Sequence, residues 1–368
     1  MARGEAYRTR PGRYVVELAV LFLALGATAR AQGPAPPSPV PPGDLAPSVN
    51  ATEPTTESLF AEPPVAAPSF AADGEPAPTA PWGETGLFDT ITDSLFGDVY
   101  AEGRWRPLSF RTFFSEGWRE SWAEAPAGRD GLTPRHGWLG AFDGVFYRLW
   151  VARFSYSNDI NTPFGGNRYA GDYSIFLPLS RRFEVLLDVP IVASNRATDA
   201  PHGYTSHFGD LTVTPRFLLS ETAGTSQVFA LAVRTPTGTP STGGGISALT
   251  PRYEFWTNPG GPWVVRGAGG IFIPLNQSDT GAPTAFVGGL AVGRYFTRHD
   301  APLGDLVLYC ESNITAPLGA SQPTVASVGP GTRFHIANNY FFLADLDFPV
   351  TTTKPYNYTL LVALLKVF

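Results

Sequence analysis

From about residue 143 to the C-terminus, apolar and polar residues alternate in segments of about ten residues that are separated by turn-forming clusters. In one segment, Phe183, Val185 and Leu187 occupy every second position, with Glu184 and Asp188 among the positions between. Side chains alternate between the two faces of a strand, so such a segment is predicted to be a strand with one apolar and one polar face. The predicted strands are residues 143–158, 168–179, 182–193, 208–220, 227–235, 245–256, 263–275, 283–296, 304–316, 324–336, 340–350 and 357–368.

A soluble sandwich and a membrane barrel would both show this alternation, but three features favour the barrel. The strands have the roughly 9–11 residues that a tilted strand needs to cross a bilayer. The connections after the odd strands ("DINTPFGGN", "SNRATDAPHGYTSH") are longer on average, and richer in Gly, Pro, Asn and Thr, than those after the even strands ("SR", "TRHDAPL"). An even number of strands places both chain ends at one side. The predicted fold is all-β, a transmembrane antiparallel up-and-down β-barrel of about 12 strands.

The N-terminus has the pattern of a targeting segment. Four arginines within the first thirteen residues precede the apolar run "VVELAVLFLALG", and "ARA" ends at Ala31. A basic head, a short apolar run and small residues at the cleavage position predict a signal peptide over residues 1–31. Residues 32–82 are rich in Pro and Ala and are predicted to be a disordered periplasmic linker.

Residues 83–140 form the third predicted segment. Leu87, Ile91, Leu95 and Val99 recur every four residues, which predicts a short amphipathic helix. The aromatic stretch "RWRPLSFRTFFSEGWRESW" follows. The favoured interpretation is a small lid on one end of the barrel, and the alternatives are a plug and an interfacial belt. The barrel itself is assigned to residues 141–368.

Composition and charge agree with an exported β protein. Aromatic residues make up 13% and charged residues 16% of the chain, which also contains 39 Gly and 36 Pro. Removing residues 1–31 removes five Arg and two Glu, a net +3, so the mature chain carries −6 − 3 = −9. This acidic balance argues against a nucleic-acid partner. The single Cys310 excludes an intrachain disulfide.

The polar faces of the strands would line the lumen if the apolar faces meet lipid. Arginines gather on the fourth to seventh strands, and acids on the third and on the ninth to eleventh. Two walls of opposite sign would tune ion selectivity, whereas an interior ion-pair network would fill the barrel. Twelve strands lie between a filled and an open barrel, so both remain open. The predicted lumen-lining residues are Glu184, Asp188, Asp210, Arg216, Arg234, Arg252, Glu254, Arg266, Glu311, Asp345 and Asp347.

The sequence offers little support for catalysis. Five histidines are present, and no Ser–His pair has a spacing that would place both on one face of a strand. Ser206 and His207 are adjacent and would point to opposite faces. No cluster has the spacing of metal ligands. We therefore expect no catalytic residues, no metal, no cofactor and no enzymatic activity.

Several motifs are typical of a known family. "HFGDLTVTPRFLLSE" and "ALAVRTPTG" combine Gly-Asp, an alternating strand, a turn and a strand that ends in Pro-x-Gly. Other strands end in Pro, as in "GGIFIPLN" and "ADLDFPV". From about residue 140 to residue 368 the chain resembles the bacterial outer-membrane barrel family labelled putative transporter of the MetA pathway of phenol degradation. The resemblance implies an outer-membrane barrel that passes small organic molecules.

Two features of the last predicted strand bear on the barrel hypothesis. In barrels of this kind a C-terminal aromatic, here Phe368, is similar to the signal that the outer-membrane assembly machinery reads. The inner face of this strand, from Leu361 to Val367, is also apolar and needs a cover, for which the segment around Phe113 and Trp118 is the candidate. The expected partners are outer-membrane lipid, the assembly machinery and an unknown small solute. Two functions remain: a narrow channel for small solutes, and a structural or receptor barrel with a filled lumen and a periplasmic tether.

Overall fold

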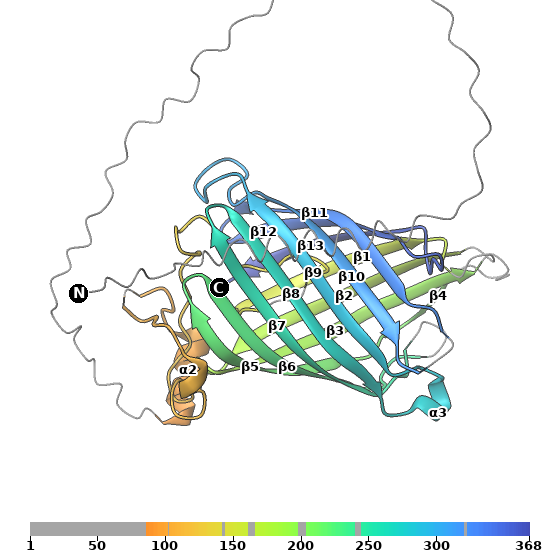
Figure 1. Ribbon diagram of the computed structural model, residues 1–368, viewed down its shortest axis with the longest axis horizontal. Coiled ribbons are helices and arrows are strands. Elements are labelled where there is room, and N and C mark those ends of the chain that lie inside the picture. The colour runs from red at the N-terminus through yellow and green to blue at the C-terminus, as the bar shows by residue number, and fades with distance from the viewer. Residues whose placement is uncertain are drawn as a thin grey trace, which may run out of the picture.

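The structure, a computed structural model, describes residues 86–368 except residue 102 and residues 142–143, 161–165, 198–203, 240–243 and 320–321. The predicted signal peptide and the predicted linker lie outside the described residues, and so does residue 143, the predicted start of the first strand. Figure 1 shows that the strands form a barrel, with the helix α2 (Leu87–Phe96) at one of its ends.

Twelve long antiparallel strands make up the wall of the barrel within the described residues. Each pairs with its neighbours in sequence, and β1 closes the barrel by pairing with β13 from Leu149↔Val367 to Asn158↔Tyr358. The predicted fold class and strand number are confirmed. The wall strands are β1 (Leu149–Asn158), β2 (Gly166–Pro178), β3 (Phe183–Ala197), β5 (Thr212–Thr222), β6 (Thr225–Arg234), β7 (Ala248–Gly260), β8 (Trp263–Pro274), β9 (Ala285–Tyr295), β10 (Val307–Pro317), β11 (Val325–Ala337), β12 (Tyr340–Pro349) and β13 (Tyr358–Val367).

A short strand that the sequence pattern did not predict is β4 (Tyr204–His207). It pairs with the last residues of β3, from Ala193 to Arg196, beyond the stretch of β3 that pairs with β5. The β3–β4 hairpin therefore extends the wall on one side without adding a strand to the closed barrel.

The two ends of the barrel differ. The end where β1 begins and β13 ends has most of the short connections, the β9–β10 connection being the exception, and we call it the turn end; the opposite end is the loop end. Asn338 and Asn339 join β11 to β12 at the turn end with φ values of 49° and 60°. Two consecutive residues with positive φ are the geometry of a two-residue hairpin turn, which asparagine tolerates well.

Burial in the wall is reversed relative to a soluble protein. Phe229 and Tyr253 are 38% and 43% exposed on the outer face, whereas Glu254 and Arg266 are 1% and 0% exposed on the inner face. An apolar outer surface around a charged interior is the arrangement that a lipid surrounding requires.

The first strand begins later than the sequence pattern predicted. β1 starts at Leu149, and residues 144–147 leave the wall and run inside the barrel. Val145, Phe146 and Tyr147 are all buried. Three consecutive apolar side chains would place at least one on the polar face of a strand, and inside the barrel all three find apolar neighbours.

Residues 123–148, which we call the plug, lie within the turn end of the barrel. Trp138, Leu139, Val145 and Tyr147 form one buried cluster with inward-facing residues of β1–β3, β7–β10, β12 and β13. The interpretation favoured from the sequence, a lid on the barrel end, therefore holds for only part of the 83–140 segment. Its second half fills the lumen, because its apolar residues complete the inner faces of the strands.

Residues 86–122, which we call the collar, lie around the rim of the turn end. They contain α2 (Leu87–Phe96), which confirms the predicted helix, and the 3₁₀-helix η1 (Phe110–Thr112). A further short helix, α3 (Gln277–Thr280), lies in the β8–β9 connection. Among the described residues, no helix has both the length and the apolar character needed to span a membrane.

Candidate solute pathway through the barrel

Three inward-facing arginines hold the plug by its backbone. Arg216 on β5 donates to the Val145 carbonyl at 2.9 Å. Arg266 on β8 and Arg333 on β11 both donate to the His136 carbonyl, at 2.6 Å and 3.0 Å. A guanidinium has five donors in a rigid fork, so it can satisfy a carbonyl of the plug and a neighbour in the wall together. Arginine side chains from widely separated strands thus hold the plug by its main-chain carbonyls.

Arg216 is also the centre of an ion-pair network in the wall. It pairs with Glu184 of β3 and, at 3.0 Å, with Glu254 of β7. Glu254 accepts a second contact from Arg252 at 2.5 Å. All but Arg252 are almost completely buried. Buried charges need such partners. The arginine pattern had suggested a basic wall, but this part of the wall is electrically balanced.

Aromatic contacts fix the tip of the plug. The ring of Trp138 stacks on that of Tyr309 at 4.8 Å between centroids, and the Arg266 guanidinium lies 4.9 Å from the Trp138 ring. The Tyr309 hydroxyl accepts from the Leu139 amide at 3.1 Å. At the base of the plug, the guanidinium of Arg135 lies 4.5 Å from the Trp256 ring. The plug tip is therefore held mainly against β8 and β10.

The apolar inner face of the last strand is covered by the plug and not by the collar. Ala363, Leu365 and Val367 belong to the buried cluster that includes Trp138 and Leu139. The prediction that residues around Phe113 and Trp118 would cover it is wrong. Trp118 instead lies against Phe217 on the outer face of β5, with 6.3 Å between ring centroids. The pattern identified the need for a cover, but periodicity alone could not distinguish two neighbouring aromatic segments.

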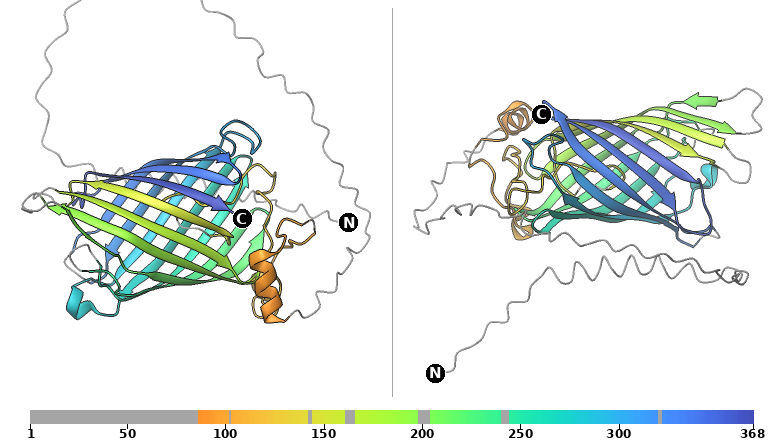
Figure 2. Two further views of the ribbon diagram at one scale, coloured as in Figure 1. Left: turned by 180° about the vertical axis from the view of Figure 1, so that it is seen from behind. Right: turned by 90° about the horizontal axis from the view of Figure 1, so that it is seen from above.

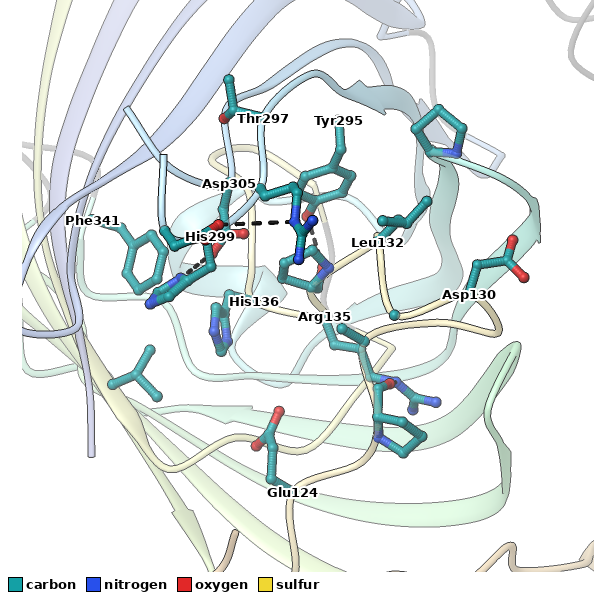
Figure 3. Close-up of a pocket in the computed structure, with 18 of the residues that line it drawn as sticks. Glu124, Asp130, Leu132, Arg135, His136, Tyr295, Thr297, His299, Asp305 and Phe341 are labelled. Carbon is teal, nitrogen blue, oxygen red and sulfur yellow. Dashed lines mark hydrogen bonds and ion pairs between the residues drawn. The ribbon is translucent and has the colours of Figure 1, made fainter. Parts of the chain in front are cut away.

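Two cavities lie on opposite sides of the plug tip. The larger, of about 1040 Å³, is at the turn end and reaches Glu124, Arg135 and His136. Figure 3 shows these plug residues facing His299, Asp305 and Phe341 across the cavity. The smaller, of about 210 Å³, begins at Gly137 and continues along the inner faces of β1–β3, β5 and β7 toward Asp188 and Arg252. The strip from Arg135 to Gly140 separates the two.

The wall opposite Arg216 carries carboxylates that lack cationic partners. Glu311 of β10, Asp345 and Asp347 of β12 face inward and are buried. The described residues provide no ion pair to any of the three. One oxygen each of Glu311 and Asp347, and both oxygens of Asp345, have no hydrogen-bond partner, although the Tyr309 ring lies beside Asp345. Gly140 of the plug, at φ 70°, lies against the Glu311 carboxylate, where a Cβ atom would clash.

The remaining predicted lumen residues lie nearer the loop end. Asp188 pairs with Arg153 of β1 at 3.3 Å. Asp210, just before β5, pairs with Arg234 at 2.7 Å and accepts from the amides of Gly238, Gly245 and Ile246. Burial opposes ionisation of Asp210, but the three amides and Arg234 outweigh it and lower its pKa. Asp210 therefore stabilises the β6–β7 loop and does not act at the centre of the lumen.

Sequence reasoning missed several inward-facing charged residues. Arg153, Asp172 and Arg333 lie on strands whose predicted polar faces were not assigned residue by residue. Arg135 and Glu221 pair at 3.0 Å where the plug meets the end of β5. Extending the alternation through β1, β2 and β11 would have found the first three. The Arg135–Glu221 pair joins residues far apart in sequence, and no local pattern marks it.

Two ionisable groups of the plug have shifted pKa values. Burial raises the pKa of Glu124 to about 8, and Arg135 and Arg148 only partly offset this. The side chain still keeps some exposure to the turn-end cavity. Burial, together with Arg333 and Arg266, holds the pKa of His136 well below its ordinary value. Both groups are thus favoured in their neutral forms within the lumen.

Histidines also gather at the turn end. The Nδ1 atom of His299 lies 2.7 Å from Asp305, and its ring stacks on that of His335 at 4.3 Å. Within the described ranges, no group of three or more His, Cys, Asp or Glu side chains is arranged to hold a metal ion.

The C-terminal residue meets the collar. The amide of Phe368 donates to the Arg148 carbonyl at 3.0 Å, and its carbonyl accepts from the Tyr100 hydroxyl at 3.1 Å. The side chain of Phe368 remains half exposed. The last strand, the start of β1 and the collar therefore meet at one point of the rim.

The match to a protein family agrees with this architecture. Residues 139–356 match the family described as putative MetA-pathway of phenol degradation, and the match spans more than half of the chain. The chain belongs to this family. The family match begins inside the plug and ends before β13, so the wall of the barrel carries it and the collar does not. The search of curated proteins found no match.

Three solved structures are similar to this chain over 60% of its length. An outer membrane channel from Pseudomonas putida F1 aligns with 15% identity and a TM-score of 0.46, over 60% of this chain and 94% of the other. The KdgM porin aligns with 9% identity and a TM-score of 0.40, over 60% and 99%. The beta domain of the Bordetella autotransporter BrkA aligns with 11% identity and a TM-score of 0.37, over 60% and 98%.

Proposed function

We propose that this barrel is a narrow outer-membrane channel for small solutes, and that the plug limits its conductance. The observation that carries the proposal is the pair of cavities on opposite sides of the strip from Arg135 to Gly140. A solute that enters the lumen from the loop end reaches the smaller cavity and meets this strip before the larger one. Passage through the barrel therefore requires the strip to move.

The way the plug is held supports its displacement. Arg266 and Arg333 hold His136 through hydrogen bonds from their side chains to a carbonyl, and these can be exchanged for water. The strip itself contains Gly137 and Gly140, which allow backbone conformations closed to other residues. The plug also belongs to no strand of the wall, so its movement would leave the pairing of β1 with β13 intact.

Conductance of the refolded protein in planar bilayers tests the proposal. The double variant Arg266→Gln/Arg333→Gln removes two attachments of the plug, and we expect larger or more frequent openings than in the unmodified protein. Arg168→Gln is the matched control, because Arg168 is an inward-facing arginine of β2 with no hydrogen bond to the plug among the described residues. Discrete channels should also be seen after residues 32–140 are deleted. The absence of channels from all these proteins would rule out the pore.

A second function, a structural or receptor barrel with a filled lumen, has one observation in its favour. The plug and the buried ion pairs occupy the turn end of the lumen. In that case the Arg266→Gln/Arg333→Gln variant would lose stability without gaining conductance, and solute flux into vesicles would equal that of empty vesicles.

The proposed location is the outer membrane, with the turn end and the N-terminal segment in the periplasm. Both ends of the barrel wall lie at the turn end, and short connections face the periplasm in barrels of this type. We propose that residues 1–31 direct export, that residues 32–82 form a periplasmic linker, and that the assembly machinery reads the last strand ending in Phe368. Deleting Phe368 should reduce the folded protein in outer-membrane fractions, and an unchanged amount would count against the signal.

We propose no enzymatic activity for the barrel. The His299–Asp305 pair is the arrangement closest to a catalytic pair, and among the described residues no serine or cysteine is hydrogen-bonded to His299. Hydrolysis of a chromogenic ester above the rate of an His299→Gln variant would overturn this.

A further inference from the structure

The helix α2 packs through its polar side, mainly against other residues of the collar. The hydroxyl of Thr90 donates to the Arg119 carbonyl at 3.2 Å. The hydroxyl of Ser94 lies within donating distance of the Thr90 carbonyl at 2.7 Å and of the Leu179 carbonyl in the β2–β3 turn at 3.3 Å, and it accepts from the Trp122 amide at 2.8 Å. Both side chains are completely buried. A polar contact face is unusual for an amphipathic helix, which normally packs on a protein with its apolar side.

The two flanks of α2 differ in chemistry. Successive residues of an α-helix are rotated by about 100°, so Ile91 and Leu95 lie on one flank of the line through Thr90 and Ser94, and Asp93 lies on the other. Asp93 pairs with Arg104 of the collar, so the acidic flank has a cationic partner within the collar. The apolar flank and the ends of the helix carry exposed apolar side chains, of which Phe88 is 79% exposed.

A row of aromatic rings connects the collar to the outer face of the barrel. From Phe114, which is 91% exposed, neighbouring rings follow at centroid distances of 5.0 Å and 5.4 Å to Phe113 and Trp118. Trp118 lies 6.3 Å from Phe217, and Phe217 lies 6.4 Å from Phe229 of β6. The row thus joins the outermost ring of the collar to side chains that face the bilayer.

The direction of the helix agrees with this continuity. In Figures 1 and 2, α2 lies at the turn end and runs across the long direction of the barrel. A helix in that position lies parallel to the plane of the membrane, as interfacial amphipathic helices do. Aromatic side chains concentrate at the same depth in membrane barrels.

We propose that the collar binds the phospholipid of the membrane leaflet that surrounds the turn end, with Phe88, Phe96 and Phe114 inserted at the boundary between headgroups and acyl chains. The continuity of the aromatic row with the outer face of β5 and β6 selects lipid as the occupant. The collar is then an interfacial anchor, and its polar face holds the base of the plug near the rim. This inference concerns the surroundings of the barrel and does not depend on whether the lumen conducts.

Site-directed spin labelling of the full chain in phosphatidylethanolamine and phosphatidylglycerol vesicles tests the proposal. Cys310→Ser provides a cysteine-free background, in which Phe88→Cys and Phe114→Cys place single labels on the collar. The native Cys310 is exposed on the wall and serves as the bilayer reference, and Asp300→Cys in the exposed β9–β10 turn serves as the water reference. We expect the ratio of oxygen to nickel-chelate accessibility at 88 and 114 to exceed that at 300 several-fold.

Other outcomes identify other occupants. Equal accessibility ratios at 88, 114 and 300 would place the collar in water and overturn the proposal. Dipolar broadening between labels at position 88 would show that a second copy of the chain covers the collar instead of lipid.

A second measurement uses proteins without cysteine substitutions, so that misfolding of a cysteine variant cannot explain the result. Phospholipid brominated near the headgroup should quench tryptophan fluorescence, and Trp118→Phe should remove part of that quenching. If Trp118→Phe leaves the quenched fraction unchanged, then Trp118 does not contact lipid and the proposal fails.

Discussion

The lumen of this barrel contains two groups of carboxylates in different surroundings. Glu184 and Glu254 are clamped by Arg216, whereas Glu311 and Asp345 have no cation within ion-pair distance among the described residues. Both groups are buried on inward faces of the same sheet. Burial alone therefore does not define the role of a lumen carboxylate; its partner does. The paired group stabilises the wall and the plug, and the unpaired group lines the lumen without a cation to balance it.

The largest expected effect comes from removing the cation of the paired group. Arg216→Met leaves Glu184 buried without its cation and Glu254 with Arg252 alone, and it removes the hydrogen bond to Val145. Loss of one partner from a buried ion pair costs about 3–5 kcal/mol. We expect urea unfolding in detergent to shift by this amount or the folded, heat-modifiable form to be lost. A shift below about 1 kcal/mol would show that the network contributes no more than exposed ion pairs do.

A smaller and opposite effect is expected on the unpaired side. Asp345→Asn keeps the shape of the side chain and removes a buried carboxyl group that has no cationic partner, so stability should stay the same or rise by about 1 kcal/mol. If the barrel conducts, its preference for cations over anions should fall, because the wall of the lumen loses one carboxyl group. Reversal potentials under a salt gradient measure this. A loss of stability as large as that of Arg216→Met would remove the distinction between the two groups.

Glu124 has surroundings intermediate between those of the two groups, and its substitution should have the smallest effect on stability. It is near Arg135 and Arg148, which favour its charge, and near Glu221, which opposes it. Its pKa is about 8 in the folded protein against an ordinary value of 4.5. Between these pH values the folded protein holds a proton that the unfolded chain has released. The stability of the plug should therefore fall as the pH rises through this window.

The pH dependence of channel opening, or of the urea midpoint, measures this effect. Glu124→Gln should make the profile flatter between pH 5 and pH 8, since the amide cannot ionise. Asp130→Asn, which changes another carboxylate at the same cavity, is the matched control and should leave the profile unchanged. A profile that keeps its slope in Glu124→Gln would assign the titration to another group.

The sequence predicted the wall well and the interior of the turn end poorly, for physical reasons. Alternation along each strand is a local property, so residues such as Glu184 and Arg266 could be placed on the polar face directly. The partner of Arg216 depends on which strands are neighbours and in which register, and only the pairing of β3 with β5 brings Glu184 opposite Arg216. The plug carries no periodic pattern, because it follows the shape of the lumen instead of a regular hydrogen-bond ladder.

The path of the plug has a mechanical consequence. The collar and the start of β1 both lie at the turn end, so the chain enters and leaves the lumen by the same opening. Nothing has to be unthreaded for it to withdraw. Tension applied to the chain before Gly86 would act in series, first on the Thr90 and Ser94 contacts and only then on the hydrogen bonds of His136. The contacts of the collar would therefore break before the plug is pulled out of the lumen.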